Sequence, residues 1–294
     1  NSHNEFDPLE EVIVGRVEGA TIPEWHVSGK AVWPEKYWDM YNHDSIKLAD
    51  NNYQPENSPL IAMEAQHNSA ELRKNYLDVP AEGQLSDDLA KNLVHGYYAS
   101  VTYMDALIGE LIKGLDDLGL RDNTTIILWS DHGYFLGEHG FWCKHSTFEE
   151  AVKIPFIISS PSHIKNKTTT SFTELVDVYP TLCDIANIKA PSYLQGESLI
   201  PVLENPSTIL KTEVYTRYKQ GEAVIDKDFS YTEFYEGEKY LGNMLYDNLN
   251  DYKQNTDISK LNNILNDILE DLDKIFLQLI SFIENEIDLN YPAV

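Results

Sequence analysis

The sequence predicts an α/β fold, in which a mixed sheet is flanked by helices and followed by a small antiparallel sheet and a terminal helix. One observation is a long amphipathic stretch, residues 86–119, whose apolar side chains recur at steps of three and four. A second is a pair of short apolar runs, residues 124–129 and 155–159, which are typical of buried strands. A third is a series of aromatic-rich runs within residues 211–249, which favours antiparallel strands.

Composition limits the classes of protein to which the chain can belong. With 294 residues and 42% hydrophobic content, the chain can form one large domain or two smaller ones. A formal net charge of -26 argues against a nucleic-acid partner, because the phosphates would be repelled. The sequence contains neither a membrane-spanning apolar run nor a recognisable signal peptide, so localisation stays open. Cys143 and Cys183 are expected to be free thiols, with Cys183 in the core on a helix.

The elements before the first strand can be read from local signals. Residues 1–33 are expected to hold a turn at Asp7-Pro8 and a short strand at Val12–Val14. Residues 34–80 are rich in Asn, Pro and aromatic residues without periodicity, which predicts a long ordered loop. The helix after this loop has Ser86 as its N-cap and Gly119 at its end.

The later elements come after a turn at residues 121–123. Residues 172–186 predict a second helix, with one apolar stripe made of Leu175, Val178, Tyr179, Leu182 and Ile185. From Leu261 to Phe282 apolar residues alternate in steps of four and three, which predicts one helix of about 25 residues that packs on its own domain or self-associates. We therefore expect four units: residues 1–33, residues 34–210, residues 211–256 and residues 257–294.

The most informative segment is residues 130–146, which directly follows the first predicted strand. Asp131 and His132 place a carboxylate and an imidazole at the end of that strand, and Gly133 lets the backbone turn. Lys144 follows as a compact positive charge. A bound cation beside a lysine could hold and polarise an oxyanion ester, because both spread the charge on its oxygens. Glu138 and His139 are expected to stabilise the turn, while Glu149 and Glu150 are expected to face solvent or cap the loop.

Several segments of the sequence, in the same order, resemble those of the sulfatase family of the alkaline-phosphatase superfamily, in particular iduronate-2-sulfatase-type members. These segments are Asp131-His132-Gly133, Leu136 to Lys144, Pro34 to Tyr41, Ser86 to Ala90, Gly96 to Val101, Asp177 to Cys183 and Leu245 to Asp247. The resemblance implies a partial sulfatase fold from about residue 33 onward. It also implies hydrolysis of a sulfuric ester, with a sulfated carbohydrate as the substrate.

The same resemblance implies roles for three residues, and the position of a fourth residue suggests one. Asp131 and His132 match metal ligands, with calcium as the ion, although a histidine ligand is more typical of zinc and the spacing leaves the metal open. Lys144 matches the lysine that contacts the sulfate, and His145 could help to orient the substrate. Each of these residues could instead be an ordinary polar residue at a strand end or on the surface.

Three parts of the family pattern are missing from this sequence, one of which is a Lys-Pro-His-x-Pro segment that usually precedes Tyr37-Trp38-Asp39. The pattern includes an aspartate pair for the metal and a Cys-x-Pro-Ser-Arg segment whose cysteine becomes the formylglycine nucleophile. Neither Cys143 nor Cys183 has that context, so no catalytic nucleophile is identified and the chain alone is expected to be inactive and to bind calcium weakly. Two alternatives stay open: a non-catalytic remnant or one subunit of a two-chain assembly completed by an N-terminal sulfatase segment, and a metal-dependent phosphatase or phosphodiesterase of the same superfamily.

The first 33 residues resemble a different family. Asn4 to Arg16 is similar to the opening strand of glycine amidinotransferases, and the likeness continues to about Trp33. The catalytic cysteine and histidine of that family have no counterpart after Trp33. The segment could belong to a fusion, a mispredicted gene product or an engineered chain.

Overall fold

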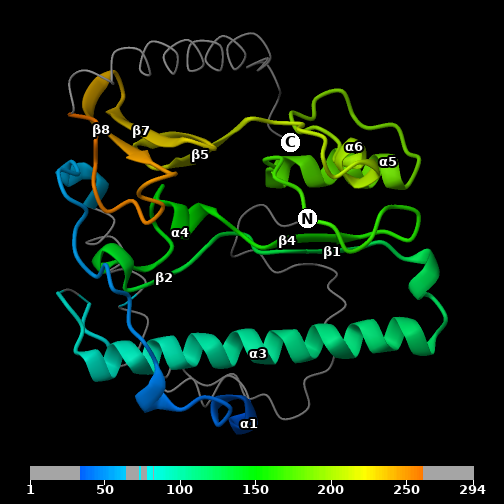
Figure 1. The fold of residues 1–294 in the computed structure, drawn as a ribbon, viewed down its shortest axis with the longest axis horizontal. Coiled ribbons are helices and arrows are strands. Elements are labelled where there is room, and N and C mark those ends of the chain that lie inside the picture. The colour runs from blue at the N-terminus through cyan, green and yellow to red at the C-terminus, as the bar shows by residue number, and fades with distance from the viewer. Residues whose placement is uncertain (1–33, 64–72, 74–77, 82, 261–294) are drawn as a thin grey trace, which may run out of the picture.

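The computed structural model describes residues 34–63, 73, 78–81 and 83–260. The long helix α3 (Asp87–Asp117) runs along one side of a strand pair, β1 (Ile126–Trp129) and β4 (Phe156–Ser159). Helices α5 (Val178–Ile185) and α6 (Ile200–Glu204) lie on the opposite side of this pair (Figure 1). Helices and strands therefore form layers, and the predicted α/β class is confirmed.

Helix α3 begins and ends where the local signals predict. The Ser86 side chain accepts a hydrogen bond from the Leu89 backbone N–H at 3.3 Å, as an N-cap does. Gly119 follows the helix with a φ of 65°, a left-handed conformation that favours glycine. The buried face of α3 includes Val94 and Ala99 and packs against α1 (Glu35–Trp38) and the loop residues after it.

Strands β1 and β4 form where predicted, but the prediction that they are buried is wrong. They pair antiparallel, with Ile127 opposite Ile158, and make a two-stranded sheet within the described residues. Trp129 is 45% exposed and Ile157 is 57% exposed. A continuous apolar run indicates a strand covered on both faces, and the part of the chain that the structure describes covers these faces incompletely.

The predicted C-terminal sheet is confirmed. Strands β5 (Glu213–Tyr218), β6 (Gly221–Asp226), β7 (Phe229–Glu236) and β8 (Lys239–Asp247) form an antiparallel meander in sequence order. Its buried side chains Val224, Tyr231 and Leu245 pack together. Figure 1 shows this sheet beside α4 (Glu149–Val152).

The second predicted helix is shorter than expected, and its expected stripe is not its buried face. Helix α5 starts at Val178, after the 3-10 turn η5 (Leu175–Asp177). Tyr179 and Leu182 are 51% and 42% exposed, whereas Thr181 is fully buried. The cause is a polar network around Asp177, which fixes the start of the helix and turns its polar residues inward. Cys183 is a free, buried thiol on α5, as predicted.

Other predictions are tested only in part. The predicted loop at residues 34–80 contains α1 and the 3-10 turn η2 (His43–Ser45), so it is less irregular than expected. The predicted turn at residues 121–123 is the 3-10 turn η3 (Arg121–Asn123). The strand expected near Val12 and the helical tail after Leu261 lie outside the described residues. Within the described ranges, no helix has both the length and the apolar content needed to cross a membrane.

Candidate active site

The informative segment forms a small hairpin held between two apolar clusters. Strands β2 (Phe135–Leu136) and β3 (Trp142–Cys143) pair antiparallel across the 3-10 turn η4 (Glu138–Gly140). Phe135 and Phe141 pack into one cluster with Phe148 and Tyr246, while Trp142 packs on the opposite side against α3. The hairpin is therefore fixed by side chains on both of its faces.

Hydrogen bonds stabilise the turn of this hairpin, as the sequence predicts for Glu138 and His139. A Glu138 carboxylate oxygen accepts a hydrogen bond from the Leu136 N–H at 2.7 Å, and the His139 N–H donates to the Asn51 carbonyl at 2.7 Å. Gly137 and His139 both have positive φ, at 117° and 54°. The glycine accommodates this backbone without steric cost.

Beneath the turn lies a buried pair of titratable groups, and the expectation that Glu150 faces solvent is wrong. His139 Nε2 lies 4.0 Å from Glu150 Oε2, and their side chains are 0% and 23% exposed. Burial lowers the pKa of His139 to about 4 and raises the pKa of Glu150 to about 7. Glu150 turns inward because it belongs to α4, whose Ala151 packs into the cluster of Phe135 and Phe148.

Gly133 is required by a close approach of backbones. Its N–H donates to the Ala151 carbonyl at 2.7 Å, which ties the end of the motif to α4. A Cβ at this position would lie 2.0 Å from the Glu150 carbonyl oxygen. The φ of Gly133 is not positive, so the reason for glycine is the lack of room for a side chain and not a left-handed backbone.

A cavity of about 510 Å³ brings the four predicted site residues together. Asp131 and His132 come from the segment after β1, and Lys144 and His145 follow β3. At the end of β3, Cys143 has a φ of 73°, an unusual conformation for a residue with a side chain. All four residues line this one cavity. Metal binding by Asp131 and His132, and substrate binding by Lys144 and His145, stay predictions.

The geometry of the Asp131 and His132 pair suits a shared cation. His132 Nδ1 donates a hydrogen bond to the Gly133 carbonyl at 2.7 Å, since the carbonyl oxygen can only accept. In the neutral ring this leaves the lone pair on Nε2, which lies 3.3 Å from Asp131 Oδ2. Two electron-rich atoms at that distance favour a proton or a metal ion between them. Asp131 is 75% exposed, so an ion could reach it from solvent.

Strand β5 supplies residues to this cavity that sequence reasoning missed. The rings of His145 and Tyr218 stack with centroids 5.2 Å apart and an interplanar angle of 13°. Arg217 lines the same cavity and lies 3.3 Å from Glu222. The sequence predicted a strand at Arg217 and Tyr218. A strand pattern does not indicate which cavity the strand lines, so these two residues could not be assigned to the site.

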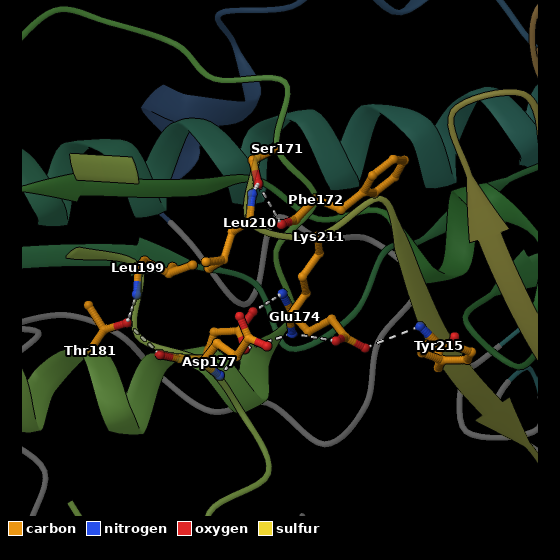
Figure 2. Close-up of polar contacts among 10 residues, drawn as sticks. Ser171, Phe172, Glu174, Asp177, Thr181, Leu199, Leu210, Lys211 and Tyr215 are labelled. Atoms are coloured by element: carbon orange, nitrogen blue, oxygen red, sulfur yellow. Dashed lines mark hydrogen bonds and ion pairs between the residues drawn. The ribbon is translucent and has the colours of Figure 1, made fainter. Parts of the chain in front are cut away.

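The opposite wall of the cavity is anchored by the polar network in Figure 2. Figure 2 shows Lys211 between Glu174 and Asp177, with ammonium to carboxylate distances of 2.6 and 2.7 Å. The other Glu174 oxygen accepts a hydrogen bond from the Tyr215 N–H of β5 at 3.1 Å. Glu174 lines the cavity and Asp177 is fully buried, so this network joins the start of α5 to the C-terminal sheet.

The described residues do not complete a metal site. Within them, no group of three or more His, Cys, Asp or Glu side chains could hold an ion. Asp131 and His132 supply two donors, whereas a zinc site uses about three or four protein ligands and calcium takes about six to eight oxygen ligands. These side chains therefore fit an incomplete coordination shell.

Two family models match most of the described chain. A model described as Sulfatase matches residues 27–188. A second, described as N-sulphoglucosamine sulphohydrolase, C-terminal, matches residues 137–286. Together they cover the hairpin, the cavity and the C-terminal sheet.

Three known proteins with similar sequences or folds are longer than this chain. A protein of Formosa agariphila named Sulfatase is 28% identical over 221 residues, which are 74% of this chain and 41% of the relative. The N-acetylglucosamine-6-O-sulfatase of Bacteroides thetaiotaomicron is 39% identical over 152 residues, or 47% of this chain and 27% of the relative. A solved structure in complex with its substrate, D-glucosamine-2-N,6-O-disulfate, has a TM-score of 0.60 at 28% identity and covers 76% of this chain and 46% of that chain. The chain spans less than half the length of each.

Proposed function

Because this chain belongs to the sulfatase family, we propose that it contributes part of the active site of an enzyme that hydrolyses sulfuric esters of a carbohydrate. The supporting observation is the single cavity lined by Asp131, His132, Lys144 and His145. The substrate class is inferred from the Bacteroides N-acetylglucosamine-6-O-sulfatase and from the solved complex with a disulfated glucosamine. The sulfatase fold expected from the sequence motifs is confirmed by that solved structure.

The proposed roles follow from charge and position. The Lys144 ammonium would contact the sulfate oxygens, where negative charge grows as the ester bond breaks. Arg217 lines the same cavity, but its guanidinium is paired with the Glu222 carboxylate, so Lys144 carries the proposed contact with the sulfate. His145 would orient the substrate, because stacking on Tyr218 limits the motion of its ring.

We also propose that Asp131 and His132 supply two ligands of a divalent metal, with calcium as the ion that the family resemblance implies. Such an ion, when bound, polarises the ester and stabilises its oxygens. With two protein donors, the chain alone should bind calcium only in the millimolar range. Calorimetric titration with calcium, and with zinc for comparison, tests this, and micromolar calcium affinity would contradict it.

The nucleophile is proposed to come from another sulfatase segment, since this sequence has no Cys-x-Pro-Ser-Arg motif. The exposed apolar side chains of Leu128 and Ile157, which are opposite each other in the β1–β4 pair, provide a surface on which such a segment could pack. Co-purification with the upstream half of the Formosa relative would support this assembly. Failure to associate would favour a non-catalytic remnant.

The decisive experiment measures binding of N-acetylglucosamine 6-sulfate to the full chain. Lys144→Ala should weaken binding about tenfold, because one charge-assisted contact is lost. Lys227→Ala, at an exposed turn, is the matched control and should bind as the unchanged chain does. Equal binding by Lys144→Ala, or equal binding of the unsulfated sugar, would contradict the proposal. The chain alone should release no sulfate, and repeated turnover would show that it contains an unrecognised nucleophile.

A further inference from the structure

The hairpin of β2 and β3 departs from the alternation of a strand at Cys143. Around β2, Tyr134 and Leu136 pack with the cluster next to α3, and Phe135, which lies between them, packs in the other cluster. Residues opposite each other in a ladder share a face, and Cys143 is opposite Phe135. Cys143 nevertheless packs with the cluster next to α3, beside its neighbour Trp142. Its side chain is therefore turned to the face that a regular strand would not give it.

The cause is the backbone of Cys143, whose φ is 73°. This left-handed conformation is unfavourable for a residue with a side chain, so the surroundings must hold it. The thiol is 3% exposed, and the Tyr134 hydroxyl donates a hydrogen bond to its Sγ at 3.5 Å. The Tyr134 ring stacks in turn on Tyr97 of α3, with centroids 5.2 Å apart and an interplanar angle of 26°. Helix α3 thus constrains Cys143 through Tyr134.

The conformation of Cys143 determines where Lys144 goes. An extended Cys143 would continue the ladder and place Lys144 opposite Tyr134. In the structure the ladder ends at Cys143, and Lys144 lines the cavity of the candidate active site. We propose that Tyr134 is a positioning residue for Lys144, because it holds Cys143 in the conformation from which the lysine enters this cavity. The consequence for sulfate binding rests on the proposed function, whereas the position of Lys144 can be measured without a ligand.

Carbon-13 NMR of the full chain, with its lysines reductively methylated, measures that position. The Lys144 signal is assigned by its loss in Lys144→Arg. Tyr134→Phe removes only the hydroxyl and should move this signal, because Cys143 is then released toward an extended backbone. Cys143→Val should move the signal further in the same direction, since a β-branched side chain rarely adopts a positive φ. An unmoved Lys144 signal in Tyr134→Phe would overturn the proposal.

Three further variants separate positioning from a general loss of structure. Cys183→Val replaces the other buried thiol, on α5, and should leave the Lys144 signal in place. Cys143→Ser keeps an acceptor for the tyrosine hydroxyl and should also leave it in place. In the Cys143→Val background, Tyr134→Phe should have no further effect, because the hydroxyl acts through Cys143. Additive shifts in this double variant, or an equal shift in Cys183→Val, would overturn the proposal.

Binding of N-acetylglucosamine 6-sulfate then relates the position of Lys144 to the proposed function. Tyr134→Phe should bind about fivefold more weakly, because Lys144 occupies the cavity for a smaller fraction of the time. Cys183→Val should bind as the unchanged chain does. Equal affinity of Tyr134→Phe and the unchanged chain would overturn the positioning role. If the Lys144 signal moved in Tyr134→Phe but the unchanged chain did not bind the sulfated sugar, the proposed function would be contradicted and the positioning role would stand.

Discussion

The C-terminal sheet and the β1–β4 pair differ in how well the described residues cover them. In the C-terminal sheet, Val224, Tyr231 and Leu245 are at most 2% exposed. In the β1–β4 pair, Trp129 and Ile157 are 45% and 57% exposed. The first sheet has a core of its own, whereas the second presents apolar side chains to solvent.

The comparison shows where the candidate active site obtains its rigidity. Asp131 and His132 follow β1, the less covered strand, yet the chain after them is fixed at once by the hydrogen bond from Gly133 to Ala151. The hairpin and α4 are buried around Phe148, which is fully buried. The site should therefore depend more on α4 and on the C-terminal sheet than on the strand that leads into it.

The largest expected effect comes from Gly133→Ala. The new methyl group would overlap the Glu150 carbonyl, so the backbone must move and the bond to Ala151 is lost. We expect the free energy of unfolding to fall by about 4 kcal/mol, measured by urea denaturation. Gly109→Ala in α3 is the control; it meets no atom within 4 Å and should stabilise the helix by up to about 1 kcal/mol. A Gly133→Ala protein as stable as the control would show that α4 does not constrain the motif.

The next effect concerns the network that joins the start of α5 to the C-terminal sheet. Lys211→Met would leave the carboxylate of Asp177 buried without its positive partner, and should cost about 3 kcal/mol of unfolding free energy. In Lys227→Met, the lost pair with Asp228 is exposed, so the change should stay within about 0.5 kcal/mol. Comparable losses in the two variants would mean that the network in Figure 2 does not hold the cavity wall in place.

Local signals made part of the fold predictable. Helix α3 was predictable because its cap, its periodicity and its terminal glycine all lie within the helix or next to it. The start of α5 was not, because Asp177 is held by the Glu197 N–H and by Lys211, which lie 20 and 34 positions away. Burial of β1 and β4 depends on what covers them, which a strand pattern does not specify.

The same limit applies to the candidate site. Asp131, His132 and Lys144 could be predicted as candidates because they lie in one short motif with the hairpin, and their roles stay predictions. Arg217 and Tyr218 reach the cavity through strand β5, and the order of side chains along a strand does not specify which cavity it faces. The left-handed backbone of Cys143 likewise depends on packing against α3, and its local sequence gives no sign of it.

A smaller, pH-dependent effect is expected at Glu150, which supports the hairpin from α4. Its pKa is about 7 in the folded chain and 4.5 without the protein environment, so the folded state retains a proton that the unfolded state releases. Stability is therefore fully present below about pH 4.5 and decreases as pH rises through 7.

Glu150→Gln removes this titration. Between pH 4.5 and pH 8 the unchanged protein should therefore lose roughly 2 kcal/mol more unfolding free energy than the variant, a value that allows for the partial exposure of the carboxyl group. His139 titrates in both proteins, so its opposite loss of stability below pH 6.5 largely cancels in the difference. Thermal unfolding across this pH range provides the measurement. Parallel curves for the two proteins would show that Glu150 ionises as readily as an exposed carboxyl group.

The smallest effect is expected for a substitution in the β1–β4 pair, and a similar substitution in the C-terminal sheet provides the comparison. Ile157→Thr replaces a 57% exposed side chain and should change the free energy of unfolding, measured by urea denaturation, by less than about 0.5 kcal/mol. Val224→Thr places a hydroxyl in the core of the C-terminal sheet and should cost about 2 kcal/mol. If Ile157→Thr were as costly as Val224→Thr, the β1–β4 pair would be covered in solution by residues beyond those described. The difference in exposure between the two sheets would then disappear in the complete chain.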